Sequence, residues 1–321
     1  MRRFVAVRLI HAVVVLFIVT TIAFFMVHLA PGDPFGFENA RLTGEFREQL
    51  RERFGYDRPL AEQYWRYLAN VAQGDLGYSH SLQMPVARAI AVTLPRTLLL
   101  MGIALVLSFG VGMWMGVFEA RRVGRASARA ANGVTMLLYS LPAFWLALMI
   151  LLAFSYWIPL FPASGMRDAA LADYMTPGQA FVDRVRHLAL PVLSLVLVTA
   201  SYIARYQRAA LLDVLPLDFI RTARAKGLAN AQVVGRHALR NALLPMITLA
   251  GYLFPYLLGG AVVVERIYAW PGMGLLVTNA IGSRDYPLVV AAVIVGALMV
   301  AIGNLLADIG YGLADPRIRT G

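Results

Sequence analysis

The chain has 321 residues, of which 59% are hydrophobic and 15% charged, and its mean hydropathy is +0.65. Soluble domains are about 45–50% apolar and about 25% charged, so this composition excludes an ordinary soluble protein and indicates an integral membrane protein. The chain has no cysteine, which excludes disulfides, thiolate zinc sites and cysteine nucleophiles.

Six apolar runs are close to the ~20 residues that a helix needs to cross a bilayer. Only helices and closed barrels satisfy the backbone in lipid, and continuous apolar runs are not barrel strands. We therefore expect an all-α integral membrane protein with six transmembrane helices. The predicted spans are Leu9–Leu29, Leu98–Phe118, Gly133–Ile158, His187–Ile203, Ala242–Val264 and Pro287–Leu306.

The first apolar run is expected to stay in the mature protein. It has about 21 residues, whereas the apolar core of a signal peptide has ~7–15, and no small-x-small cleavage site follows closely.

The charge distribution predicts the orientation. With a cytoplasmic N-terminus, the inner segments carry 16 basic and 5 acidic residues, and the outer segments carry 13 of each. The whole net charge of +11 then lies on one side, as the positive-inside rule requires. We expect both termini in the cytoplasm, and the positive charge gives no reason to expect a nucleic-acid partner.

The outer segment 31–96 is the largest predicted piece outside the membrane. Apolar residues recur in it at four-residue spacing, which predicts two short amphipathic helices. The positions are Phe46, Leu50 and Phe54, and then Tyr64 and Leu68 after Pro59, which suits a first helical turn. These helices would lie on the outer mouth of the bundle or on the lipid interface.

The most distinctive segment, Asp218–Pro245, is basic and amphipathic and lies between two spans. Asp218 predicts an N-cap, and Lys226 followed by Gly227 predicts a helix end with a C′ glycine. Asn230 predicts the cap of a second helix that runs to about Leu244, with Pro245 opening the next span.

Two apolar patches and a basic stripe are expected on this loop. The patches are Phe219, Ala223 and Leu228, and Val233, Val234 and Leu244; the stripe is Arg236 and Arg240, one turn apart. A basic helix lying on anionic lipid is the alternative interpretation. The Gly-Leu-Ala-Asn break favours docking into the cleft of a protein partner, because a helix on a lipid surface has no reason to be interrupted.

The loop resembles the EAA loop of permease subunits in ABC importers. RTARAKGL and HALRNALLP depart from the general EAA pattern at Arg221, Thr222, His237 and Arg240, and resemble the variant of peptide/nickel-type permeases. Further blocks agree in order along almost the whole chain: PGDP at 31–34, GDLGYS at 74–79, YSLPAFW at 139–145, HLALPVL at 187–193, ERIYAWPGMG at 265–274, RDYPLV at 284–289 and DPRIR at 315–319.

The resemblance implies a permease subunit of the type I ABC importer kind in the inner or plasma membrane of a prokaryote. It implies a second, related permease, two cytoplasmic P-loop ATPases that bind ATP and Mg, and an extracytoplasmic substrate-binding protein. It also implies that the loop transmits ATPase closure as a coupling helix. The implied coupling residues are Asp218, Arg221, Thr222, Ala223, Lys226, Gly227, His237, Leu239, Arg240 and Asn241. Di- or oligopeptides are the implied cargo; nickel chelates, glutathione, oligosaccharides and cationic peptides remain alternatives.

The expected organisation has four parts: 1–30 with the first span, the outer segment 31–96, a permease core 97–310 containing the coupling loop 205–241, and a cytoplasmic tail 311–321.

The chain carries no signature of chemistry of its own. Its single lysine, Lys226, is not part of a Gly-Lys-Ser/Thr phosphate loop, and its five histidines show no paired metal-ligand spacing. No GxSxG nucleophile elbow occurs. The spans hold almost no ionisable residues, which argues against the other alternative, a stand-alone secondary transporter or channel. Glu119 is expected at the membrane interface.

Small residues and prolines in the spans mark candidate path positions, although such residues are more often packing or kink devices. The candidates are Tyr139, Ser140, Pro142, Gly251, Pro255 and Gly259. Gly112 and Gly116 are interpreted as helix packing. An outer turn, Trp270, Pro271, Gly272 and Gly274, is a candidate outer gate or binding-protein contact, with an aromatic-belt role for Trp270 as the alternative.

Overall fold

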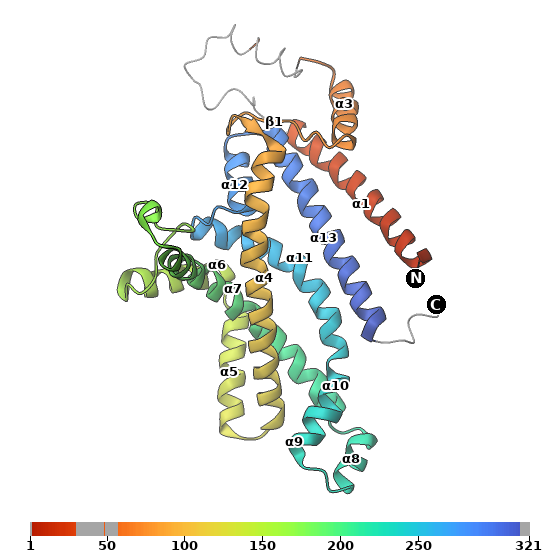
Figure 1. Cartoon of the computed structure of the whole chain (residues 1–321). Coiled ribbons are helices and arrows are strands. Elements are labelled where there is room, and N and C mark those ends of the chain that lie inside the picture. The colour runs from red at the N-terminus through yellow and green to blue at the C-terminus, as the bar shows by residue number, and fades with distance from the viewer. Residues whose placement is uncertain (1, 30–47, 49–56, 315–321) are drawn as a thin grey trace. The chain divides into compact units, whose positions relative to one another are not determined.

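The computed structural model describes residues 2–29, 48 and 57–314, and these residues are mainly helical, as predicted (Figure 1). They fall into two compact units, which are described separately. The first contains residues up to Thr97 together with Pro271–Ala301, and the second contains Leu98–Trp270 and the residues from Ile302 onward.

The first unit combines helices with one small hairpin. Its elements are α1 (Arg2–Leu29), α3 (Leu60–Ala72), β1 (Tyr78–Ser79), β2 (Met84–Pro85), the beginning of α4 (Val86–Arg121), α12 (Met273–Gly282) and most of α13 (Tyr286–Ala314). The two strands are antiparallel, with Tyr78 opposite Pro85. The start of α4 packs against α12 and α13 through buried Val86, Ile90 and Leu288.

The amphipathic helix predicted around Tyr64 and Leu68 is confirmed as α3. Its buried Tyr64 ring lies 5.4 Å from the Phe24 ring of α1, and the Tyr64 hydroxyl is 2.8 Å from the Thr21 hydroxyl. Pro59 is the N-cap residue and lies just outside the first turn. The other predicted helix, over Phe46–Phe54, lies outside the described residues apart from position 48.

Asp285 joins two blocks that are far apart in the sequence. Its Oδ2 accepts hydrogen bonds from the Ser79 hydroxyl at 2.5 Å and from the Ser81 amide and hydroxyl at 3.0 and 2.8 Å. Its Oδ1 accepts from the Leu288 amide at 3.3 Å, so the same carboxylate caps α13. Asp285 is 1% exposed. Burial lowers the pKa of the nearby His80, and the negative charge of Asp285 partly opposes this shift. The hairpin is thereby fastened to the start of α13.

The second unit contains the rest of α4 and the helices that follow it. These are α5 (Ala126–Ser140), α6 (Ala143–Leu151), the π-helical turn η1 (Leu152–Trp157), the short turn η2 (Ala172–Tyr174), α7 (Pro177–Val214), α8 (Asp218–Ala225), α9 (Asn230–Gln232), the π-helical η3 (Val233–Ala238), α10 (Leu239–Ala242) and α11 (Leu244–Ile267). Figure 1 shows the α4–α5 turn and the α8–α10 segment at the same end of this unit.

α7 lies against α4 at very short range. A Cβ on Gly112 would be 2.7 Å from the Ala200 carbonyl oxygen, and one on Gly116 would be 2.6 Å from the Ala204 carbonyl oxygen. The interpretation of these glycines as a helix-packing pair is therefore confirmed.

Tyr268, which follows α11, connects three elements of this unit. Its hydroxyl donates to the Ala147 carbonyl of α6 at 2.9 Å and is 2.9 Å from the Ser194 hydroxyl of α7. Burial raises the pKa of Tyr268 to about 12.

The third predicted span, Gly133–Ile158, is wrong as one continuous helix. The chain bends by 104° between α5 and α6, at Leu141 and Pro142. Leu141 is extended (φ −78°, ψ 135°) because a residue before proline avoids the α region, and Pro142 has no N–H to continue the hydrogen-bond ladder.

The fourth predicted span, His187–Ile203, is much too short. α7 has 38 residues and starts with a capping box in which the Thr176 hydroxyl accepts from the Gln179 amide and the Gln179 side chain accepts from the Thr176 amide. Pro191 lies inside this helix.

The other four predicted runs lie in helices with shifted boundaries, α1, α4, α11 and α13. Among the described residues, α1, α4, α7 and α13 are long and apolar enough to cross a bilayer, and the bent α5–α6 pair adds a fifth candidate. The expected count of six spans with cytoplasmic termini remains a prediction.

Candidate functional site

The segment between α7 and α11 folds as a compact loop of short helices. α8 ends at Lys226, and Gly227 follows with φ +76°, the left-handed conformation of a C′ glycine, as predicted. This residue reverses the chain so that α9, η3 and α10 return toward the start of α11.

The two predicted N-caps are wrong by one residue. Leu217 and Ala229 are the N-cap residues, and Asp218 and Asn230 are the first helical residues. At that position the Asp218 carboxylate still favours the positive end of the α8 dipole. Its contact with Arg221, 3.3 Å long, joins two strongly exposed side chains and contributes at most ~1 kcal/mol.

An apolar core holds the loop to the ends of α4 and α7. Ile220 and Ala223 of α8 pack with Val233 and Ala238 of η3, together with Ala120, Leu211 and Ala242. Burial of a side chain such as Ile220 contributes about 1.5–3 kcal/mol, which exceeds the exposed ion pair. The loop is therefore attached to the bundle by packing rather than by charges.

This core corrects the predicted docking patches. Ala223, Val233 and Val234 are buried within the chain, so they are not available to a partner. Phe219 and Leu228 of the first predicted patch remain 41% and 37% exposed. The side chain of Leu244 is outside the described set.

The other predicted coupling residues differ in their exposure. Arg221, Thr222, Lys226 and Arg240 are exposed, whereas His237 and Leu239 are half-buried. The Thr222 hydroxyl donates to the Asp218 carbonyl, and the exposed Asn241 amide donates to the His237 carbonyl, so both stabilise the helices locally.

Glu119, which was expected at the membrane interface, is fully buried within the protein, next to Ala120 of the apolar core that holds the loop. Its Oε1 accepts from the Thr135 hydroxyl at 2.7 Å, and its Oε2 lies 3.8 Å from Arg208 Nε. Three helices, α4, α5 and α7, thus share one carboxylate near the end that carries the loop. No periodicity signalled this arrangement, because the partners come from different helices.

Tyr139, a candidate path residue, belongs to an exposed aromatic cluster. Its ring stacks on Tyr202 at 6.1 Å, the Arg205 guanidinium lies 4.2 Å from the Tyr139 centroid, and the Tyr202 hydroxyl donates to Tyr206 at 3.1 Å. Tyr202, Arg205 and Tyr206 were not predicted as site residues, although their spacing of three and four residues places them on one helix face.

The other candidate path residues lie outside this aromatic cluster and differ in their exposure. Ser140 is exposed and donates to the Met136 carbonyl, and Pro142 is the N-cap of α6 at the bend. Gly251 is buried, whereas a Cβ on Gly259 would meet no atom of the described residues within 4 Å. The side chain of Pro255 is outside the described set.

Trp270 is completely buried in the core of the second unit, which is incompatible with an aromatic-belt position and with direct contact to a binding protein. The following residues of the turn belong to the first unit, where Gly272 and Gly274 are buried. There the Met273 amide donates to the Thr97 hydroxyl at 2.8 Å, and Arg96 donates to the Pro271 carbonyl.

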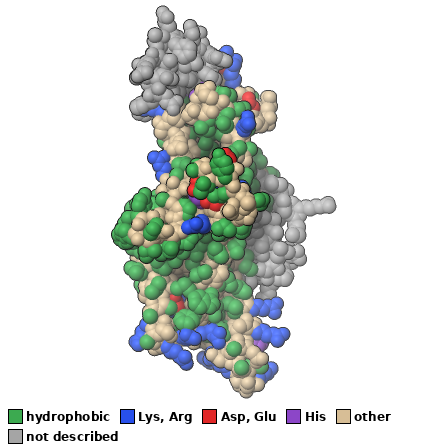
Figure 2. Space-filling model, turned by 60° about the vertical axis from the view of Figure 1, so that its left-hand side comes forward, with side chains coloured by type: hydrophobic (Ala, Val, Ile, Leu, Met, Phe, Trp, Pro, Cys, Tyr) green, Lys and Arg blue, Asp and Glu red, His purple; other side chains and the backbone are tan. Residues whose placement is uncertain are grey.

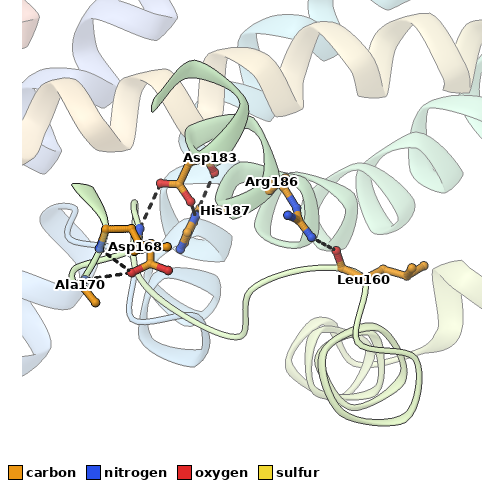
Figure 3. Close-up of polar contacts among 7 residues, drawn as sticks. Leu160, Asp168, Ala170, Asp183, Arg186 and His187 are labelled. Atoms are coloured by element: carbon orange, nitrogen blue, oxygen red, sulfur yellow. Dashed lines mark hydrogen bonds and ion pairs between the residues drawn. The ribbon is translucent and has the colours of Figure 1, made fainter. Parts of the chain in front are cut away.

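The segment between η1 and α7 is tied to the start of α7. Figure 3 shows the Asp168 amide donating to Asp183, which also contacts the His187 ring, while Arg186 donates to the Leu160 carbonyl at 2.9 Å. His187, the first residue of the HLALPVL block, therefore has a structural role here. Across the part of the chain that the structure describes, no group of three or more His, Asp or Glu residues could hold a metal ion.

These features define a class: a multi-pass membrane protein in which a compact, partly exposed loop of short helices lies between two of its apolar helices. Residues 108–320 match the family described as binding-protein-dependent transport system inner membrane component, and residues 1–101 match the N-terminal family of such components. The chain belongs to this family. It is a permease subunit of an ABC importer in the bacterial inner membrane, and ATP hydrolysis belongs to a separate subunit.

Relatives align over nearly the whole chain. It is 36% identical to the oligopeptide transport system permease protein AppB of Bacillus subtilis (97% of each chain). It is 38% identical to the di/tripeptide transport system permease protein DppB of Pseudomonas aeruginosa, and 35% identical to the glutathione transport system permease protein GsiC of Escherichia coli (99% of each chain in both cases).

Solved structures agree on the fold. A chain of the inward-facing MetNI methionine ABC transporter matches with a TM-score of 0.57 at 18% identity, covering 71% of this chain and 97% of that chain. A chain of an amino acid ABC transporter matches with a TM-score of 0.51 at 14% identity, covering 70% and 94%. At this identity the likeness supports the type I importer fold alone.

Proposed function

We propose that this chain is one of two related permeases that together form the path of a di- or oligopeptide importer. Two cytoplasmic ATPases bind ATP and Mg, and an extracytoplasmic binding protein delivers the cargo. The proposal of a peptide cargo rests on the identity of 36% to an oligopeptide permease and of 38% to a di/tripeptide permease, each over nearly the whole chain.

The coupling loop supports the proposed connection to the ATPases. Its helices share an apolar core with the ends of α4 and α7, so a push on the loop moves those helices as one body. Phe219 and Leu228 are exposed apolar side chains, and Arg221 and Lys226 on the same segment are exposed cations, so the loop offers both kinds of contact to a groove in a partner. The other coupling residues, from His237 to Asn241, would keep the second half of the loop in shape.

The aromatic cluster supports a path along α5 and α7. A charged arginine is unfavourable against acyl chains, so Arg205 and the Tyr139 and Tyr202 rings beside it would face the second permease or the passage between the two. Ser140, Pro142 and Gly259 would extend that surface, with Gly251 and Pro255 on α11 beside it. The turn of Trp270, Pro271, Gly272 and Gly274 would act as an outer gate.

Glutathione is a second candidate cargo, because the GsiC relatives are almost as similar as the peptide permeases. The test uses the complete importer, reconstituted with its binding protein. Loaded binding protein should stimulate ATP hydrolysis severalfold, and the vesicles should accumulate di- to pentapeptides. Accumulation of glutathione but of no other peptide would replace the first cargo with the second. Uptake that ignores ATP and collapses with a protonophore would contradict both.

A further inference from the structure

A cavity of about 570 Å³ opens where α4 ends, on the side of the second unit that carries the coupling loop. Its walls are of two kinds. Trp114, Val117 and Phe118 form an apolar part, and Arg121, Arg122 and Arg125 form a cationic part; Asn230 of α9 also lines the cavity.

The apolar and cationic parts form one column along α4. The Trp114 and Phe118 rings stack at 5.9 Å, and the Arg122 guanidinium lies 4.3 Å from the Phe118 ring centroid. Trp114, Phe118 and Arg122 are four residues apart, so the surface of the helix changes from an indole at Trp114 to a guanidinium at Arg122 over about 12 Å. Trp114 is 68% exposed. Such a change is typical of a membrane–water interface, where aromatic side chains lie toward the hydrocarbon and the charged ends of basic side chains lie toward the water.

The charge of the cavity is unbalanced. Arg121, Arg122 and Arg125 are exposed, and among the described residues none of them forms an ion pair. Figure 2 shows blue basic side chains bordering the green hydrophobic surface at this lower end of the view. Arginines bind phosphate oxygens in a bidentate manner, so the cluster is suited to a phosphate.

The apolar wall identifies the source of that phosphate. Trp114 and Phe118 belong to the apolar run of the second predicted span, and the α4 helix that contains them is long and apolar enough to cross a bilayer. A soluble anion or an acidic protein surface would leave this wall without a partner, whereas a phospholipid covers both parts at once.

We propose that this cavity binds an anionic phospholipid of the inner leaflet. Its phosphate lies between Arg121, Arg122 and Arg125, and its acyl chains run along Trp114 and Phe118. Because Asn230 lines the same cavity, the bound lipid contacts the first residue of α9 and links the coupling loop to the membrane. The site requires only that the chain lies in the inner membrane, and it does not depend on the cargo.

The test measures lipid binding to the whole importer complex, purified in detergent and titrated with phosphatidylglycerol or phosphatidylcholine while bound lipids are counted by native mass spectrometry. Arg122→Gln should weaken phosphatidylglycerol binding about fivefold, since one basic residue near an anionic surface contributes about that factor. Arg129→Gln is the matched control, because Arg129 is an exposed arginine at the same end outside the cavity; it should change binding less than twofold. Arg122→Lys should retain most of the binding.

Three results would overturn the proposal. Equal weakening by Arg122→Gln and Arg129→Gln would mean a diffuse surface potential. Equal binding of phosphatidylcholine would mean that charge is not recognised. Displacement of the lipid by millimolar glycerol phosphate would mean a site for free phosphate. None of these readouts uses ATP or cargo, so they are separate from the test of peptide transport.

Discussion

Replacing Gly227 with valine is expected to reduce ATP-dependent uptake at least tenfold while the protein still reaches the membrane. Gly227 has φ +76° with open space where a Cβ would lie, so the conflict is one of backbone conformation rather than contact. A left-handed conformation costs an L-residue about 1–2 kcal/mol, and a β-branched residue more. Relaxation of the turn would move α8 relative to η3 and displace the exposed Phe219 and Leu228. Uptake in vesicles, normalised to inserted protein, measures the effect.

Two controls isolate the cause. Gly74→Val introduces similar strain, at φ +82° and also in open space, but outside the loop, and it should leave uptake within about twofold after normalisation. Gly235→Ala adds a side chain in open space within the loop at a position that is not left-handed, and it should be tolerated. Full uptake by Gly227→Val would remove the loop from the transport mechanism, as expected for a stand-alone carrier.

Replacing Gly116 with valine is expected to prevent stable packing of the second unit. Its Cβ would lie 2.6 Å from the Ala204 carbonyl oxygen and 3.0 Å from the Arg208 amide, and backbone atoms cannot move aside as a side chain can. The cost should reach or exceed the upper end of the ~1–3 kcal/mol range for overpacked cores. Separation of α4 from α7 would also lengthen the Glu119–Arg208 contact. Thermal unfolding in detergent should show a clear loss of melting temperature or aggregated protein.

Gly110→Val is the matched control for this substitution. Gly110 is on the same helix, and a Cβ there would meet nothing within 4 Å. The control should melt within a few degrees of the parent chain. Equal melting temperatures for Gly116→Val and Gly110→Val would show that α4 and α7 are not in close contact in the folded protein.

The sequence predicted the features that depend on short-range patterns. The helical membrane fold, the left-handed Gly227, the amphipathic α3 and the packing role of Gly112 and Gly116 each follow from spacing or from one residue's conformational preference. Two further features had local signals that were overlooked. These are the Thr176–Gln179 capping box that starts α7 and the Leu141–Pro142 pair that bends the third span.

Burial and long-range contacts were not predictable in this way. Whether Ala223 and Val233 face a partner or each other depends on how η3 folds back on α8, which no local pattern contains. The burial of Glu119 was not predicted, because a single sequence does not show that Thr135 and Arg208 lie next to it. Trp270 likewise appeared to be a surface aromatic until the core of the second unit was known.

The most direct test of the proposed coupling role is cross-linking from the exposed face of the loop. Because the chain has no cysteine, Leu228→Cys and Ala223→Cys each introduce a single reactive thiol. In the assembled importer, a short bifunctional reagent should link Leu228→Cys to the ATPase subunit in an ATP-dependent manner, and buried Ala223→Cys should not react. Absence of an ATPase cross-link from Leu228→Cys, together with labelling by a lipid-soluble probe, would contradict the docking function and leave the loop as a helix on the membrane surface.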